Sequence, residues 1–214
     1  EPNFRTEEED KGLHYIYASD YLQAVGDYTN QETKGDWRFY DMNGSLSAKG
    51  NFNKNAEKEG KWVWFFGPEK IKETAIFKDG KINCKNLYYF PNGRLNISAQ
   101  FVNGVLSGKY DVYESRGALE HTKVFKNDML DGKYTSYFDA GETLPEFDII
   151  YKEDKIEGTA YEYYVNGDVF AEMPFKNNNR HGLEKKFYPN KQLMSETNYM
   201  DGILHGPYKA YYSN

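Results

Sequence analysis

Two histidines, His181 and His205, are the first side chains to consider for chemistry, because each directly precedes a glycine. Paired histidines are common zinc ligands and acid–base groups. They are 24 residues apart, and the repeat described below makes them equivalent positions on neighbouring strand pairs, about 10 Å apart. Two nitrogen ligands of one zinc ion are only about 3–3.5 Å apart, given bonds near 2.0–2.1 Å. We interpret both histidines as polar strand positions and predict no metal site.

Other signals for catalysis are equally weak. The segment NGVLSGKY at 103–110 resembles a phosphate-binding loop, but three residues separate its glycines where four are needed, and Tyr110 replaces the magnesium-binding Ser or Thr. The single cysteine, Cys84, excludes an intrachain disulfide. No histidine is in phase with it, so we expect a small, buried or half-buried residue and not a nucleophile. The sequence predicts no enzyme, no catalytic residue and no cofactor.

The charge and hydropathy of the chain restrict its partners. The formal net charge is −6, and the lysines are interleaved with acids, so no basic face is available to hold nucleic acid. No apolar run approaches the roughly 18 residues of a membrane helix, and we predict no transmembrane segment.

The chain begins at Glu1, which indicates either a removed leader or trimming. The sequence leaves the compartment open, and we expect either the bacterial cytoplasm or, if a leader was removed before Glu1, the periplasm or cell envelope. Residues 1–11 are acidic, and we expect them to form a loose lead-in.

A repeat of about 24 residues covers almost the whole chain. Glycines recur after turn sequences and before aromatic residues, and Cys84 stands where one of these glycines is expected. We number each repeat from this residue as position 0. The repeats begin near residues 12, 35, 60, 84, 108, 132, 158, 182 and 206, and they define one domain over 12–214.

Aromatic residues keep a fixed phase in the repeat. Position 5 is aromatic throughout: Tyr17, Tyr40, Phe65, Tyr89, Tyr113, Tyr137, Tyr163, Phe187 and Tyr211. We expect position 5, with positions 11 and 17, to form the core face. Position 2 is often aromatic too, as in Trp37 and Trp62, but a regular strand would point positions 2 and 5 to opposite faces. We therefore predict a bulge between them, near the flexible glycine.

Two turn signals per repeat predict a hairpin and its register. Glycine at position 9 suits a three-residue loop that ends in a left-handed residue, which sets position 5 opposite position 11, as in Tyr89 and Leu95. Asp-Gly or Asn-Gly at positions 19–20 suits a type I′ turn, which sets Phe77 opposite Ile82. The same register would set small residues at position 15 opposite the glycine of the next repeat. The sixth repeat is longer and contains Pro145, so we expect an irregularity around 142–150.

These features predict an all-β fold, an elongated antiparallel meander of β-hairpins in a single twisted or curled sheet. A parallel β-helix and a leucine-rich repeat share the period. The leucine framework is absent, however, and the paired tight turns favour hairpins. Apolar residues do not recur at the helical period.

The chain resembles the MORN repeat variant family, in particular its bacterial YwqK-like antitoxin type. The match is carried by GKYDVYESRGALEHTKVFKNDMLDG (108–132), GKWVWFFGPEKIKETAIFKDG (60–80) and GLEKKFYPNKQLMSETNYMDGILHG (182–206). It covers about residues 12–214 and concerns glycine, aromatic and turn positions. The resemblance implies a meandering β array that acts in protein–protein interaction or as a scaffold. Membrane-lipid binding has been proposed for some members, and the antitoxin label implies a toxin as partner.

A second row of aromatics, here called the position-6 stripe, directly follows position 5. Its members are Phe66, Phe90, Phe138, Tyr164, Tyr188 and Tyr212. Adjacent residues of a strand point to opposite faces, so the stripe either packs under a curled sheet or is an exposed row that marks an interface. We treat it as the candidate partner-binding surface.

The sequence thus predicts a non-enzymatic repeat scaffold that binds another protein, with an antitoxin or immunity partner as one form of it. The alternative is an envelope-associated module that binds lipid or glycan through the position-6 stripe.

Overall fold

A computed structural model of the chain describes residues 4–8, 13–18, 21–29, 32–138 and 144–213. The chain divides into two compact units, unit 1 (Glu1–Val105) and unit 2 (Leu106–Asn214). Each unit is considered by itself below. Both consist of β-strands and turns, with no helix among the described residues.

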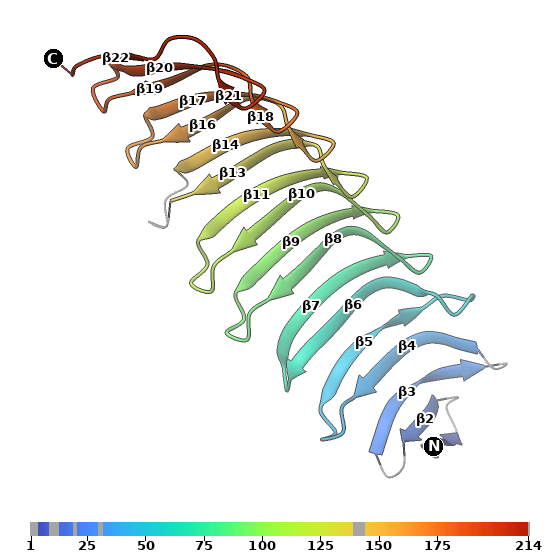
Figure 1. The fold of residues 1–214 in the computed structure, drawn as a ribbon. Helices are drawn as coiled ribbons and strands as arrows, with labels where there is room; N and C mark the ends of the chain where they lie inside the picture. Colours follow the sequence, from blue (N-terminus) through green and yellow to red (C-terminus); the bar gives the residue numbers. More distant parts are fainter. Residues whose placement is uncertain (1–3, 9–12, 19–20, 30–31, 139–143, 214) are drawn as a thin grey trace. The chain divides into compact units, whose positions relative to one another are not determined.

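Unit 1 is an antiparallel meander in which consecutive strands pair (Figure 1). Its strands are β1 (Phe4–Glu8), β2 (Leu13–Ala18), β3 (Tyr21–Thr29), β4 (Glu32–Tyr40), β5 (Leu46–Phe52), β6 (Lys58–Gly67), β7 (Lys70–Lys78), β8 (Lys81–Tyr89) and β9 (Leu95–Val102). The lead-in contributes β1, which pairs with β2. The expectation of a loose lead-in is therefore wrong for residues 4–8.

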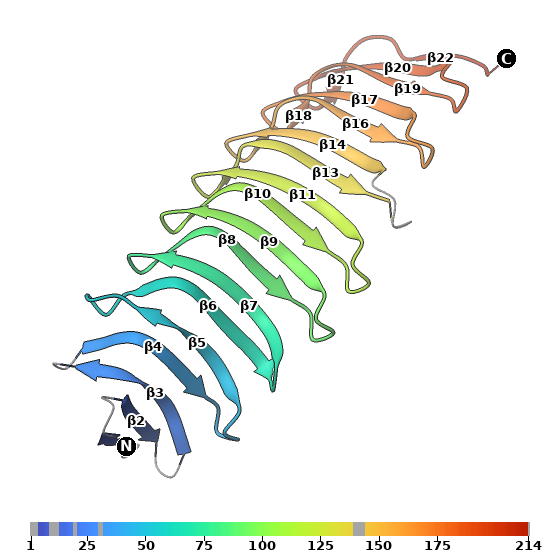
Figure 2. The same ribbon diagram turned by 180° about the vertical axis from the view of Figure 1, so that it is seen from behind.

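Unit 2 continues the same hairpin pattern with shorter strands. They are β10 (Val105–Tyr113, whose first residue ends unit 1), β11 (Leu119–Lys126), β12 (Met129–Leu130), β13 (Gly132–Tyr137), β14 (Pro145–Lys152), β15 (Lys155–Ile156), β16 (Gly158–Tyr163), β17 (Val169–Lys176), β18 (Asn179–Arg180), β19 (Gly182–Phe187), β20 (Leu193–Met200), β21 (Ile203–Leu204) and β22 (Lys209–Ala210). The predicted all-β antiparallel hairpin fold is confirmed in both units. The view from behind in Figure 2 shows no second layer over the described strands of either unit.

Both predicted turn types are present. In the two-residue turns both central residues have positive φ, as in Asp79 (48°) and Gly80 (74°), which defines type I′. Gly93 has a φ of 82° in its three-residue loop. The predicted pairs Tyr89–Leu95 and Phe77–Ile82 are register partners. Turn chemistry alone therefore predicted the register of these hairpins correctly.

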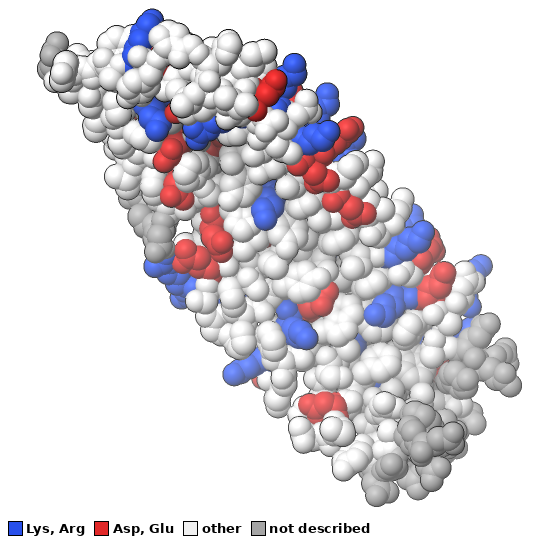
Figure 3. Space-filling view, viewed as in Figure 1, with Lys and Arg blue, Asp and Glu red and all other residues white. Residues whose placement is uncertain are grey.

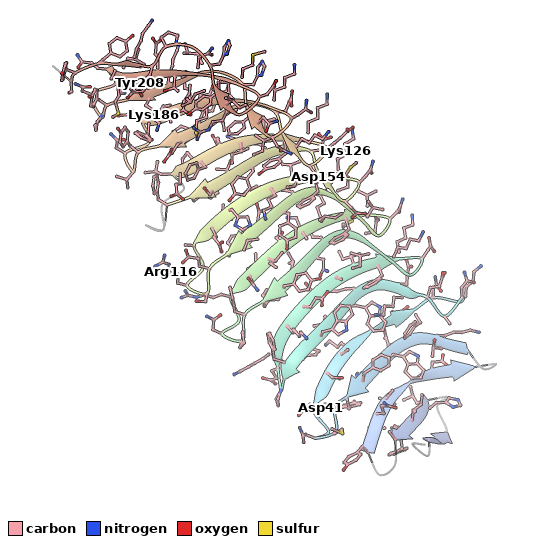
Figure 4. The ribbon with its side chains drawn as sticks, in the orientation of Figure 1. Asp41, Arg116, Lys126, Asp154, Lys186 and Tyr208 are labelled. Atoms are coloured by element: carbon pink, nitrogen blue, oxygen red, sulfur yellow. The ribbon has the colours of Figure 1, made fainter. Side chains whose placement is uncertain are left out.

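The type I′ turns also bind the preceding repeat. The N–H of the second turn residue donates to a carbonyl 22 to 24 residues earlier, as from Gly80 to Lys58 (3.0 Å) and from Asp154 to Leu130 (2.9 Å). In three turns of unit 2 the side chain adds a second bond. The acceptors are Oδ1 of Asp128, Asp154 and Asn178, and the donors are the N–H groups of Leu106, Leu130 and Ile156, at 2.8, 2.7 and 2.6 Å. We call the contact of a type I′ turn with the preceding repeat, with or without the side-chain bond, an inter-repeat hook. Asp154 is labelled in Figure 4.

A register shift does lie between positions 2 and 5, but its extra residue is on the second strand of the hairpin, such as Lys72 or Phe170. The extra residue is not near the glycine as predicted, so it does not bring positions 2 and 5 onto one face. The register shifts between positions 4 and 5 of every hairpin, for example between Trp64 and Phe65 and between Glu162 and Tyr163. The sixth repeat shows the same shift between Ser136 and Tyr137, where Pro145 pairs with Tyr137. Because all the hairpins share the shift, Pro145 is not its cause. Residues 142 and 143, included in that prediction, lie outside the described residues.

The core assignment from sequence is wrong for position 5 but correct for position 17. Phe77 is 9% exposed within one core cluster, and Phe52 and Phe175 pack against the cores of their own units.

The most buried positions are position 2, with Trp37 at 1% and Trp62 at 2% exposure, and the small residues near it, such as Ala75. Tyr163 at position 5 instead donates its hydroxyl to Asp148, which lies on the opposite face. Strand alternation explains this, because positions 2 and 4 share one face and position 5 takes the other.

Small residues at position 15 lie under the rings of position 2, and not against the glycine of the next repeat as expected. A Cβ added to Gly50 would lie 2.2 Å from the Trp62 ring, and one added to Gly26, at position 14 of the first and shorter repeat, would lie 2.3 Å from Trp37. Trp62 also donates from Nε1 to the Asn51 carbonyl (3.0 Å), which fixes the ring over the strand. The indole therefore requires glycine at residue 50.

We predict that Gly50→Ala lowers the free energy of unfolding by about 1–3 kcal/mol, because the added methyl group displaces the Trp62 ring. Gly67→Ala is the matched control in the neighbouring strand, since a Cβ added there would meet no atom within 4 Å beyond its chain neighbours. Urea unfolding followed by tryptophan fluorescence measures both. Equal stability of the two variants would contradict this packing.

Candidate interaction surfaces

The position-6 stripe lies where the first strand of each hairpin enters its turn. In unit 1, Phe66 is 45% exposed near the end of β6, and Phe90 is half-buried. The backbone of Phe90 opens its turn by accepting a bond from the Gly93 N–H (2.8 Å). The aromatic ring thus occupies a position already fixed by the backbone of the turn.

In unit 2 the stripe is in part a structural element. The Tyr164 hydroxyl donates to the Phe187 carbonyl (2.8 Å) and the Tyr188 hydroxyl donates to the Tyr211 carbonyl (2.9 Å), so each joins its repeat to the next. Phe138 is half-buried, whereas Tyr212 is 91% exposed. The six residues therefore do not form a uniformly exposed row.

A polar row crosses unit 2 in direct register. Its successive Cα partners are Asp111, Thr122, Thr135, Asp148, Tyr161, Glu172, Lys185, Glu196 and Lys209. Thr122 donates to Asp111 (2.9 Å) within the buried part of the row. Towards the C-terminus the charges alternate in sign, and alternation of this kind stabilises neighbouring strands.

Asp148 is the centre of a hydrogen-bonded cluster in this row. Its carboxylate accepts bonds from the hydroxyls of Thr135 (2.7 Å) and Tyr163 (2.9 Å), and Lys133 Nζ lies 2.8 Å away. Burial raises the pKa of Asp148, but these three partners outweigh it and hold the pKa below its ordinary value. Burial and the neighbouring Asp148 carboxylate raise the pKa of Tyr163 to about 12.

Unit 1 contains a hollow of about 520 Å³ over β4, β5 and β6. Its lining includes the exposed cations Arg38, Lys49 and Lys61 and the apolar side chains of Val63 and Phe65. We call it the cationic hollow. Charged side chains elsewhere are scattered in both signs over the face seen in Figure 3.

The residues first considered for chemistry are dispersed. His181 Nδ1 lies 3.2 Å from Asp201 Oδ1 in the turn of the next repeat, whereas the backbone N–H of His205 donates to the Asn198 carbonyl, so the two histidines have separate partners. Cys84 is exposed and has a φ of 80°, so the expectation of a buried or half-buried residue is wrong. Within the described ranges, no group of three or more metal-ligating side chains occurs.

Two further features bear on partners. None of the described residues forms a helix long and apolar enough to span a bilayer. At the turn between β10 and β11, Arg116 is labelled at one edge of unit 2 in Figure 4, opposite the edge of Lys126 and Asp154. The two edges carry different contacts, the position-6 hydroxyls on one and the hooks on the other.

The fold and these surfaces define an antiparallel β-hairpin repeat protein. A family model for the MORN repeat variant matches residues 156–177 and 180–201, so these two segments are repeats of that type. The matches begin one 24-residue period apart, in agreement with the spacing derived from the glycines. No curated protein is similar enough to the chain to count as a match.

Solved structures also match, among them a chain described as "Crystal structure of GtfA/B complex bound to UDP and GlcNAc". The identity is 16% and the TM-score is 0.24, with 60% of this chain and 25% of that chain covered. The chain thus spans about a quarter of that protein's length. A likeness at this TM-score carries no argument about fold or function.

Sequence reasoning missed the Asp148 cluster and the cationic hollow. Both depend on which residues face each other across strands, and the shift between positions 4 and 5 alters that register. A signal existed for the hollow, since Arg38 and Lys49 occupy positions 3 and 14 of one repeat, which a corrected register places opposite each other.

We predict that Asp148→Asn lowers the free energy of unfolding at pH 7 by about 1–2 kcal/mol, because the pair with the half-exposed Lys133 loses its charge. Because the pKa of Asp148 is lower in the folded chain than in the unfolded chain, its carboxylate stabilises the fold at pH values above the ordinary carboxyl pKa of about 3.9. This stabilisation is lost as the pH falls through the pKa that Asp148 has in the folded chain. The difference between wild type and variant should therefore shrink below about pH 4. A difference that stays constant from pH 7 to pH 2 in urea unfolding would contradict the assignment.

Proposed function

We propose that this chain is a non-enzymatic repeat scaffold that binds another protein. The observation that carries the proposal is the exposure of Phe66 and Tyr212 in the position-6 stripe, because exposed aromatics are enriched at protein interfaces. The half-buried stripe members Tyr164 and Tyr188 hold the repeats together, so they keep neighbouring side chains at a fixed spacing. The match of two segments to the MORN repeat variant also supports a binding scaffold.

A photo-crosslinking experiment tests this proposal. The photoreactive residue p-benzoylphenylalanine replaces Phe66 or Tyr212 in the full chain, with the exposed residue Lys78 at the end of β7 as control site. We expect one protein in an extract of the native host to crosslink at both stripe positions and not at residue 78. With that protein purified, Phe66→Ser should weaken binding at least tenfold without a change in the urea midpoint.

Absence of a specific protein adduct, together with binding to lipid vesicles or glycans that Phe66→Ser abolishes, would overturn the proposal in favour of an envelope-associated module. Neutralisation of a toxin is one specific form of protein binding. It predicts that the crosslinked protein inhibits growth when expressed alone and that coexpression of this chain restores growth.

A further inference from the structure

The cationic hollow of unit 1 combines an apolar floor with a positively charged rim. Val63, at 7% exposure, and the half-buried Phe65 form the floor, and Ile71 extends it. Arg38 and Val63 each follow a core tryptophan in their strand, so they point to the face opposite the indoles. The Lys49 ammonium lies 6.0 Å from the centre of the Phe65 ring, which places it at the margin of the floor.

The cations of the rim oppose folding. Arg38 and Lys49 are direct register partners on β4 and β5, and like charges directly opposite each other destabilise an antiparallel pair. Among the described residues, no carboxylate forms an ion pair with Arg38, Lys49 or Lys61. Asp36 is the one acid in the lining, and its Oδ1 accepts a bond from Asn51 Nδ2 (3.3 Å).

In unit 2, lysines at an equivalent position of the repeat are paired with carboxylates. Lys109 and Lys133 occupy position 1, as Lys61 does. Lys109 lies 3.1 Å from Asp111, and Lys133 lies 2.8 Å from Asp148. The three cations of the hollow have no such partner, so their charge is available to an anionic ligand.

We propose that the cationic hollow binds an acidic segment of a partner protein, with an apolar side chain on the floor and carboxylates paired to Arg38, Lys49 and Lys61. The inference rests on the proposed function and adds the chemistry of the bound segment. The guanidinium of Arg38 is suited to bidentate pairing with a carboxylate. The apolar floor is recessed, so a protruding side chain reaches it whereas the surface of a membrane does not. Three cations in a chain of net charge −6 are too few to hold a nucleic acid.

Fluorescence anisotropy with the full chain and a labelled peptide Gly-Asp-Asp-Phe-Asp-Asp-Gly tests the inference. We expect saturable binding that Lys49→Glu weakens at least tenfold. The same substitution sets an acid opposite Arg38 and removes a like-charge pair, so the urea midpoint should stay the same or rise. Lys78→Glu is the matched control, with the same charge change at the exposed end of β7 in unit 1, and it should weaken binding less than threefold.

Three results would overturn the inference. They are no binding of the peptide at millimolar concentration, an equal effect of Lys49→Glu and Lys78→Glu, and equal affinity for a peptide with Ser in place of Phe. Binding to phosphatidylserine vesicles that Lys49→Glu abolishes, without peptide binding, would assign the hollow to a membrane instead. If the hollow fails while a protein still crosslinks at Phe66, the proposed function stands and only this site is rejected.

Discussion

The inter-repeat hook is the interaction on which the rest of the structure depends. A single-layer sheet has no second layer to hold its strands in place, so each hairpin must be fixed by its neighbours. The type I′ turn does this through a backbone hydrogen bond to the preceding repeat. At Asp154 there are two such bonds: the backbone N–H donates to the Leu130 carbonyl, and the side-chain carboxylate accepts from the Leu130 N–H. Positive φ at both turn residues is what directs these groups backwards. On the opposite edge the hydroxyl of Tyr164 serves the same purpose.

Local chemistry made the hairpins predictable. Glycine and Asp-Gly signals fix turn type, and turn type fixes register, which is why Tyr89 was correctly set opposite Leu95. The core face was not predictable in this way, because it depends on an irregularity around position 0 that turn chemistry does not specify. The register of β6 with β5 shifts around Gly60, and regular alternation after it places Trp62 on the buried face and Phe65 on the other.

The Asp148 cluster and the cationic hollow differ in whether their charged side chains have partners of opposite charge. Around Asp148, opposite charges and hydroxyls satisfy one another, and the cluster stabilises the sheet. Around Arg38 and Lys49, like charges face each other over apolar side chains, and folding alone does not account for the arrangement. Lys109 and Lys133 of unit 2 each lie beside a carboxylate, whereas the cations of the hollow do not, and this difference is the basis for the proposal that an acidic segment binds there.

The most direct test of this account concerns the hook at Asp154, through amide hydrogen exchange at Leu130. Asp154→Asn keeps the side-chain acceptor, whereas Asp154→Gly removes it and still permits the φ of 64°. We predict faster exchange at Leu130 in the glycine variant and a free energy of unfolding about 0.5–1.5 kcal/mol below that of the asparagine variant. Unchanged protection of Leu130 with equal stability of the two variants would contradict the claim that the hooks hold the repeats together.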